Sequence, residues 1–463
     1  MILPDLQGES LWFPNAVAAA PWTLPSHATL LTGLYPWEHG CHSQRTNSLS
    51  PSIESIAEVL RDAGYRTGLF SSNTLLDEAG GFTRGFDAAA WGTWHETVLL
   101  VPRRSPPHHS NGGQTSPSNG SGKVRWLSRG LAPTVATRFP AFSAAANQLM
   151  WKVRSGASLE EPRTSPWIEP TFDAWLGSIE PERPAFAMIN LGDAHEPYFA
   201  PRETGLRDRL RMSSIPQDSL THMQGRRALR GEELEMLKAG YLRSLSTLER
   251  RTRNLIDILK RRNRFENTCL IVTGDHGQAF GEEGQVLHIL RGPVESLLRV
   301  PLLLRLPQGV RGGSVVDEWA SHVDVVPTVR RVCGLPLNPK CPGIALTELP
   351  REPEGRVVLS TCDGLSPAML SGMHADPARV APSLAGVAYS GSWKAVATGS
   401  GLSTRVERPW EAFPGAFGSK GSTDTRPADI EKKAGEALRA LLRDKDDADG
   451  SEAVTRRLSA WGY

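Results

Sequence analysis

The stretch with the clearest chemical content lies near the N-terminus, in PWTLPSHATLLTGLYPWEHG, residues 21–40. Pro25 suits the first turn of a helix, because its missing N–H group would have no partner there. A residue before a proline avoids the helical conformation, so we expect Thr23 and Leu24 to be extended. The Thr23 hydroxyl would then lie at a helix N-terminus, which favours an anionic group. A hydroxyl beside an anion site suits a nucleophile that attacks phosphate or sulfate; the alternative is an ordinary buried threonine before a helix.

A second segment has ionisable side chains directly after an apolar strand. The run from Phe186 to Leu191 is almost continuously apolar, as in a strand buried on both faces. Asp193 and His195 follow it. Ionisable residues just past the C-terminal end of a parallel strand mark the active edge of open α/β sheets. We therefore predict a site role for both residues, although a turn rich in Asp and Pro would also explain Asp193.

A third segment repeats this arrangement. An apolar strand from Cys269 to Thr273 ends in a glycine-flanked Asp275–His276 pair. Adjacent Asp and His side chains can give one oxygen and one nitrogen to a single metal ion. Such a ligand pair favours Zn or Mn over Ca, whose sites are built from oxygen. The alternative is a structural turn.

The surrounding pattern predicts a sheet covered by helices. Residues 53–63 have helical apolar spacing, and residues 67–71 follow as a strand. A long amphipathic helix is expected over 234–262, and another strand over 300–307. Alternation of helices and strands is typical of an α/β fold.

Composition excludes several classes of protein. The 463 residues are enough for one large α/β domain with a smaller appendage, and the formal net charge of +2 does not favour nucleic-acid binding. The five cysteines form neither a disulfide framework nor a zinc-ligand spacing. No run reaches the ~18–20 apolar residues of a membrane span, and no signal peptide is visible. As given, the chain is expected to be cytoplasmic.

The N-terminal segment resembles the nucleophile segment of the sulfatase branch of the alkaline phosphatase superfamily. That family carries Cys or Ser, then Pro, then Arg, followed by a helix ending in Thr-Gly, then Tyr-Pro and His-Gly. The matching positions here are Thr23, Pro25, His27, Thr32–Gly33, Tyr35–Pro36 and His39–Gly40. The resemblance implies an alkaline-phosphatase-like mixed, mostly parallel sheet with helices on both faces, plus a small C-terminal antiparallel subdomain.

Two positions depart from the family pattern. Threonine cannot be converted to formylglycine, the aldehyde that sulfatases use, so no formylglycine is expected at Thr23. His27 stands where the family has the arginine that supports the aldehyde. In phosphodiesterase-like and phosphotransferase-like relatives, threonine is itself the nucleophile. The resemblance therefore implies ester hydrolysis or phosphotransfer, with phosphate esters ahead of sulfate esters.

The resemblance also assigns roles to the later segments. The strand followed by His-x-Pro makes His195 a contact of the substrate anion, with Asp193 and His27 as substrate-binding residues. TGDHG, followed by GEEG, His288 and RVPLLLRLP, resembles the family's second metal segment. Asp275 and His276 would thus bind one divalent metal ion (Zn, Mn or Ca, with Zn or Mn favoured). His288 would be a second anion contact.

The resemblance also predicts a division of the chain. Residues 1–340 would form the sulfatase-like catalytic domain, with an insertion at about 88–170 that includes a flexible loop at 103–123. Residues 341–463 would form a small C-terminal α+β subdomain. The family's first core strand and its metal-binding carboxylates have no match before Thr23, since neither Asp5 nor Glu9 follows an apolar strand. We therefore expect the N-terminus to be truncated and metal binding to be weak.

These features predict a metal-dependent hydrolase or phosphotransferase. Its substrate would be a small-molecule, glycan-linked or lipid-linked phosphate or sulfate ester, with no nucleic-acid partner. The rival hypothesis is a catalytically degenerate family member that serves as a binding or scaffold module. A two-metal phosphatase site usually needs an Asp-x-x-x-His pair, which the spacing of Asp193 and His195 does not provide.

Overall fold

The computed structural model describes ten parts of the chain, and the account below concerns these parts. They are residues 3–43, 45–92, 165–196, 198, 229–288, 292–349, 356–364, 384–398, 403–407 and 429–443. The predicted flexible loop at 103–123 lies outside them, as does most of the predicted insertion. None of the helices in these parts is both long and apolar enough to cross a bilayer.

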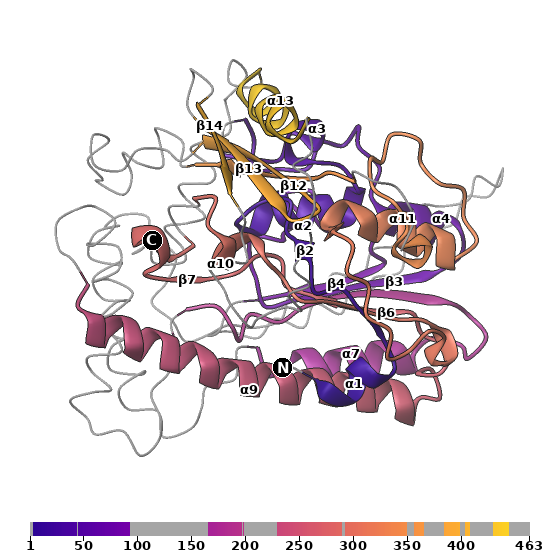
Figure 1. Ribbon diagram of the computed structural model, residues 1–463. Helices are drawn as coiled ribbons and strands as arrows, with labels where there is room; N and C mark the ends of the chain where they lie inside the picture. The colour runs from indigo at the N-terminus through magenta and orange to yellow at the C-terminus, as the bar shows by residue number, and fades with distance from the viewer. Residues whose placement is uncertain are drawn as a thin grey trace, which may run out of the picture.

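Helices lie on both sides of the central strands, as predicted (Figure 1). On one side lie α2 (Thr23–Thr32), α4 (Ile56–Asp62) and α11 (Val325–Val332). On the other side lie α7 (Ile168–Gly177) and the long helix α9 (Gly231–Arg261). The long amphipathic helix expected at 234–262 is therefore confirmed to within a few residues.

Two three-stranded sheets form the centre of the molecule. In the first, β3 (Arg66–Ser71) pairs in parallel with both β4 (Ala88–Trp91) and β5 (Ala185–Asn190). In the second, β9 (Leu302–Arg305) pairs antiparallel with β1 (Leu11–Trp12) and β6 (Leu270–Thr273). The strands expected before Asp193 and Asp275 are thus present, as β5 and β6. Strand β4 occupies the start of the predicted insertion.

Strands β5 and β6 differ from expectation in their burial. Their apolar sequences predict burial on both faces, yet every residue of both strands is only half-buried. Within the described parts of the chain, β5 pairs with β3 alone and β6 with β9 alone, so each has one open edge. Helix α9 supports both strands, because Leu255 and Ile258 belong to the cluster that includes β5, while Ile256 belongs to the one that includes β6.

Helix α2 begins two residues earlier than predicted. Thr23 and Leu24 are helical rather than extended, and Trp22 is the extended residue before them. Pro25 is therefore the third residue of the helix. Its missing N–H costs no hydrogen bond there, since the first four N–H groups of a helix have no partner within the helix. Thr23 still lies at the N-terminus of the helix.

The C-terminal part contains a four-stranded antiparallel sheet with one helix packed on it. The strands, in spatial order, are β11 (Val358–Asp363), β12 (Leu384–Ser390), β13 (Trp393–Thr398) and β14 (Ser403–Glu407). The helix, α13 (Ile430–Arg443), packs through Ala434 and Leu438 against the alanines of this sheet. This sheet confirms the predicted antiparallel subdomain, while its boundary at 340–341 stays a prediction.

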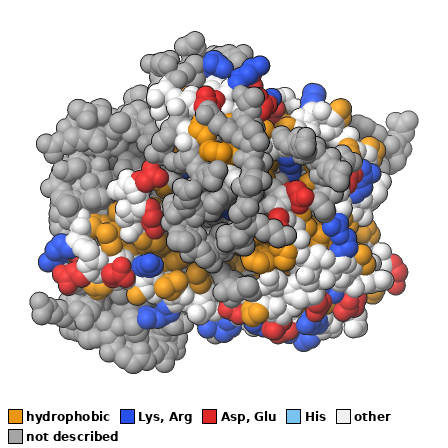
Figure 2. Space-filling model, viewed as in Figure 1, with side chains coloured by type: hydrophobic (Ala, Val, Ile, Leu, Met, Phe, Trp, Pro, Cys, Tyr) orange, Lys and Arg blue, Asp and Glu red, His pale blue; other side chains and the backbone are white. Residues whose placement is uncertain are grey.

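Several short elements connect the larger ones. They are α1 (Pro4–Gly8), α3 (Pro36–His39), α10 (Glu295–Leu298), the parallel pair of β2 (Ala16–Val17) with β10 (Ala320–Ser321), and the hairpin of β7 (Ala279–Phe280) with β8 (Val286–Leu287). On the face seen in Figure 2, acidic and basic side chains are interspersed rather than gathered by sign. This agrees with the small net charge.

Candidate active site

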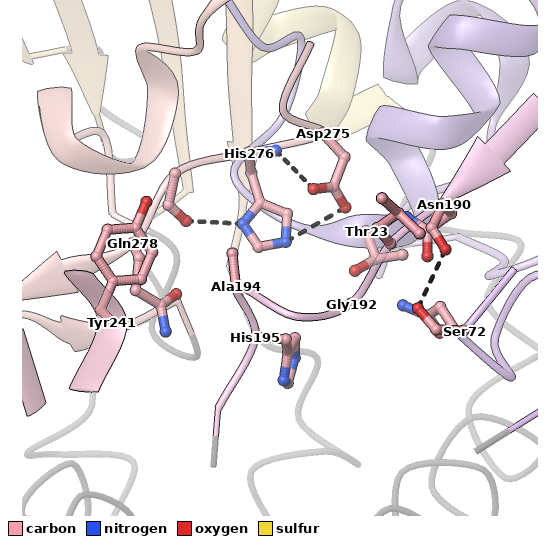
Figure 3. A pocket seen from close by; sticks show the side chains of 13 residues that line it. Thr23, Ser72, Asn190, Gly192, Ala194, His195, Tyr241, Asp275, His276 and Gln278 are labelled. Carbon is pink, nitrogen blue, oxygen red and sulfur yellow. Dashed lines mark hydrogen bonds and ion pairs between the residues drawn. The ribbon is translucent and has the colours of Figure 1, made fainter. Parts of the chain in front are cut away.

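A pocket of about 650 Å³, part of it open to solvent, lies where β3, β5 and β6 end. Figure 3 shows the side chains that line it, including Thr23, His195, Asp275 and His276. Thr23 comes from the start of α2, His195 from the segment after β5, and the Asp–His pair from the turn after β6. Four of the predicted site residues, from three separate segments, therefore line one pocket.

The entry into α2 is fixed by an aspartate of the C-terminal sheet. The indole N–H of Trp22 lies 2.9 and 3.0 Å from the two carboxylate oxygens of Asp363. The backbone N–H of Ser43 donates to the same carboxylate at 2.6 Å. Thr23, which is only 4% exposed, is thereby held at the pocket wall by contacts that involve the residue before it.

Asp275 and His276 have the arrangement expected of a pair of metal ligands. His276 Nδ1–H donates to the Gly277 carbonyl at 2.8 Å, which leaves the lone pair on Nε2, 3.5 Å from Asp275 Oδ2. Burial alone would raise the pKa of Asp275, but its electrostatic interactions with the nearby His276, His27 and His288 rings outweigh burial and lower that pKa to about 2. The carboxylate is therefore ionised, and one oxygen and one nitrogen fit a divalent cation.

His27 is not among the residues that line the pocket, although it lies next to Asp275, which does line it. The ring is 2% exposed; its Nδ1–H donates to the Thr23 carbonyl at 2.9 Å, and its Nε2 accepts from Asn190 Nδ2 at 3.2 Å. Nδ1 also lies 3.5 Å from Asp275 Oδ2. Burial lowers the pKa of His27, so the ring is neutral near pH 7. It links the first turn of α2 to the ends of β5 and β6, and a direct contact with substrate stays a prediction.

Asp193 is held by an ion pair away from the pocket. Its Oδ2 accepts from Arg251 Nη1 at 2.7 Å, and both side chains are buried. The same guanidinium donates to both carboxylate oxygens of Glu169, at 2.9 and 2.7 Å. Asp193 is therefore placed to anchor the segment after β5 to α9 and α7. Its predicted role in substrate binding remains untested.

The structure brings His288 into contact with the other predicted histidines. Its ring centroid lies 4.9 Å from that of His195 and 4.5 Å from that of His276. Burial lowers the pKa of His288 to about 3, so its imidazole is neutral at pH 7. His288 thus belongs to the histidine cluster beside the pocket, although it does not line the pocket itself.

Several site residues went unpredicted. Ser72 and Asn73 follow β3 and line the pocket; the signal that identified Asp193, a polar residue just after a strand, applies to them equally. Gln278 comes three residues after Asp275, whereas Tyr241 lies within α9 and has no sequence signal of this kind.

A buried histidine also joins the segment that carries Thr23 to the segment that carries Asp275. His322 Nε2–H donates to the Gly274 carbonyl at 3.0 Å, and its Nδ1 lies 3.0 Å from the Ser26 hydroxyl. Burial lowers the pKa of His322 to about 4. The neutral ring therefore connects α2 to the turn after β6, which carries Asp275.

Known proteins resemble this chain over most of its length. A family model described as Sulfatase matches residues 3–335. The chain is 24% identical to a putative extracellular sulfatase Sulf-1 homolog of Caenorhabditis elegans, over 73% of this chain and 44% of that protein. It is 25% identical to an endo-4-O-sulfatase of Bacteroides thetaiotaomicron, over 71% of this chain and 61% of that protein. The chain thus spans about half the length of these relatives.

Solved structures show the same fold at low sequence identity. A phosphonate monoester hydrolase of Agrobacterium radiobacter superposes with a TM-score of 0.61 at 17% identity, covering 96% of this chain and 90% of that one. A protein solved with its substrate D-glucosamine-2-N,6-O-disulfate gives a TM-score of 0.57 at 13% identity, covering 97% and 94%. With the family match over most of its length, the chain belongs to the sulfatase family and has its alkaline-phosphatase-like fold.

Proposed function

We propose that this chain hydrolyses sulfate esters in the pocket between α2 and the ends of β5 and β6, with Thr23 as the nucleophile. The observation that carries the proposal is the convergence of Thr23 with Asp275 and His276 in one pocket. The family match supports the reaction class.

A divalent cation would be held by Asp275 and His276, the two adjacent O and N ligands. When bound, such an ion polarises an ester oxygen and lowers the pKa of a coordinated hydroxyl. One oxygen and one nitrogen ligand favour Zn or Mn over Ca. This pair supplies two of the ligands that such an ion needs.

The remaining groups have supporting roles. The Thr23 oxygen would attack sulfur while the bond from sulfur to the ester oxygen breaks, and the Thr23 proton would leave with the departing alcohol. Water would then displace the Thr23 oxygen from sulfur and release sulfate, and the free N–H groups at the start of α2 would stabilise the anionic oxygens in both steps. His195, on the pocket wall, is the predicted contact of the substrate anion, together with the neighbouring His288. His27 would keep Thr23 in line with Asp275 through its hydrogen bond to the Thr23 carbonyl.

Phosphate esters are the second candidate substrates. Thr23 favours them, because a threonine cannot form the aldehyde on which the family's sulfate chemistry depends. The relatives point instead to sulfate on a sugar, since their names include an endo-4-O-sulfatase and an N-acetylglucosamine-6-O-sulfatase of Bacteroides thetaiotaomicron. We therefore place glycan-linked sulfate esters first.

The test is a turnover assay of the purified chain with added Zn²⁺ or Mn²⁺. The substrates are 6-sulfated N-acetylglucosamine, 4-nitrophenyl sulfate, 4-nitrophenyl phosphate and bis(4-nitrophenyl) phosphate. An added alcohol acceptor separates transfer from hydrolysis. Thr23→Ala should lower turnover by at least ~10²-fold, while Thr23→Ser, which keeps a hydroxyl, should retain part of it.

Turnover of the phosphate esters alone would replace sulfate by phosphate as the substrate. Equal turnover by the unchanged chain and by Thr23→Ala would remove Thr23 from the mechanism. A chain that binds these esters but converts none of them would support the degenerate, ligand-binding hypothesis instead.

A further inference from the structure

Building on the proposed function, we infer that Tyr241 of α9 binds the leaving group of the ester, and that this leaving group is a sugar ring with free hydroxyls. Tyr241 lines the same pocket as Thr23. Figure 3 shows these two residues at opposite ends of the pocket, with His276 between them.

The direction of the leaving group follows from the geometry of the displacement. In an in-line displacement, the attacking oxygen enters opposite the oxygen that leaves. With the Thr23 hydroxyl oxygen as the entering atom, the ester oxygen and its sugar point away from Thr23, toward the end that Tyr241 lines. Pockets for small ligands usually have ~300–1,000 Å³. The pocket of about 650 Å³ therefore has room for a ring as well as the sulfate group.

Neighbouring aromatic side chains hold the ring of Tyr241 in position. Its centroid lies 5.0 Å from that of Phe280 and 5.9 Å from that of Tyr198, the second pair being edge to face. The buried side chains of Leu237 and Val286 belong to the same cluster. A side chain already packed in this way loses little further freedom when a ligand contacts it. The C–H groups of a sugar ring can pack against such an aromatic ring.

The hydroxyl of Tyr241 has capacity for a new hydrogen bond. It makes none to any residue that the structure describes, and the side chain is only half-buried. Burial raises the pKa of this phenol, so the hydroxyl is protonated near pH 7 and can both donate and accept. An apolar ring with an available hydroxyl suits a sugar, which offers C–H groups and hydroxyls together.

Gln278, which also lines the pocket at this end, is already engaged by protein partners. Its Nε2 donates to Glu196 Oε2 at 2.9 Å and to the Tyr198 hydroxyl at 2.7 Å. Its Oε1 accepts from His288 Nδ1 at 2.9 Å. Both amide hydrogens of Gln278 are therefore used, whereas the hydroxyl of Tyr241 remains available to bind a hydroxyl of the sugar.

Binding to an inactive chain tests the inference without turnover. In a Thr23→Ala background with Zn²⁺ present, calorimetry gives dissociation constants for 6-sulfated N-acetylglucosamine, 4-nitrophenyl sulfate and inorganic sulfate. Tyr241→Phe removes only the hydroxyl, so it should weaken binding of the sulfated sugar ~2- to 10-fold and leave that of 4-nitrophenyl sulfate unchanged. Tyr241→Leu also removes the ring, so it should weaken binding of both esters at least ~5-fold and leave that of inorganic sulfate unchanged.

Leu242→Ala is the matched control, because Leu242 is the next residue of α9 and is 54% exposed. The inference is overturned if both Tyr241 variants bind the sulfated sugar like this control, if they lose inorganic sulfate to the same degree, or if the sulfated sugar does not bind. With Thr23 present, turnover of the sulfated sugar by Tyr241→Leu at unchanged kcat and KM would also overturn it, while the proposed function would stand. Circular dichroism checks that each variant is folded, and Tyr241→Phe, which keeps the ring, decides if Tyr241→Leu unfolds.

Discussion

Replacing Arg251 by Met tests the idea that Asp193 anchors the site segment rather than contacting substrate. Arg251 is 2% exposed and, among the residues that the structure describes, donates one hydrogen bond to Asp193, two to Glu169 and one, at 2.9 Å, to the Ser165 carbonyl. Its removal leaves the Asp193 carboxylate buried beside an apolar side chain. Breaking a buried ion pair in this way costs ~3–5 kcal/mol, and we expect the free energy of unfolding to fall by that amount.

The expected loss of stability can be divided between the two residues of the ion pair, Arg251 and Asp193. Asp193→Asn keeps an acceptor for Arg251 and loses only the charge, so the expected loss is the difference between charged and neutral hydrogen bonds, ~1 kcal/mol. The double variant Arg251→Met/Asp193→Asn no longer leaves the charge of Asp193 buried without its partner, while Glu169 loses Arg251 in both Arg251 variants. It should therefore be more stable than the sum of the single effects predicts.

The assay is equilibrium unfolding in urea, followed by circular dichroism. Arg253→Met is the matched control, because Arg253 lies on the same helix, pairs with Asp5 and Glu249, and is 41% exposed. It should unfold at nearly the urea midpoint of the unchanged protein. If Arg251→Met unfolds at the midpoint of this control, the ion pair does not anchor the segment and the reasoning fails.

Three further predictions concern single residues. His27→Ala should lower kcat by ~10²-fold with little change in KM, because the ring positions Thr23 and does not line the pocket; a raised KM at unchanged kcat would make it a substrate contact. Gly33→Ala should lower the free energy of unfolding, measured in urea, by ~2–4 kcal/mol, since Gly33 has φ +72° and a Cβ would lie 2.9 Å from Val326 Cβ. Gly64→Ala is the control, because Gly64 has φ +92° and open space around it, so that only the backbone strain is added. Equal losses for the two variants would refute the packing argument. Burial lowers the pKa of His39 to about 3, below its unfolded value of 6.5, so its contribution to the free energy of unfolding is complete above pH 6.5 and is lost as the pH falls toward 3, at ~1.4 kcal/mol per pH unit. His39→Gln should therefore make the loss of stability below pH 6.5 less steep. An unchanged slope would contradict this.

Local sequence signals were sufficient to predict which residues after the strands lie at the pocket. Asp275, His276 and His195 were predictable because an apolar run of strand length ends just before each of them. Thr23 was predictable from its place beside Pro25, although the helix begins at Thr23 itself. In each case the information lies within a few neighbouring residues.

The remaining contacts depend on how distant segments pack. Arg251 lies in a helix with many charged residues, and nothing in its neighbours marks it as the one that reaches Asp193, 58 positions away. Glu196 follows His195 directly in the sequence, but only the fold brings His288 Nδ1 to 3.8 Å from Glu196 Oε2. The half-buried state of β5 and β6 likewise depends on strand pairing, which apolar periodicity does not report.

The most direct test of the central claim is chemical capture of the nucleophile. The metal-loaded chain is mixed with 4-nitrophenyl sulfate, quenched in acid within milliseconds, digested and analysed by mass spectrometry. Our account predicts one sulfo group on the peptide that contains Thr23, absent from Thr23→Ala and from a sample quenched before substrate is added. Steady turnover with the sulfo group on another residue, or with formylglycine at another position, would contradict the assignment of Thr23 as the nucleophile.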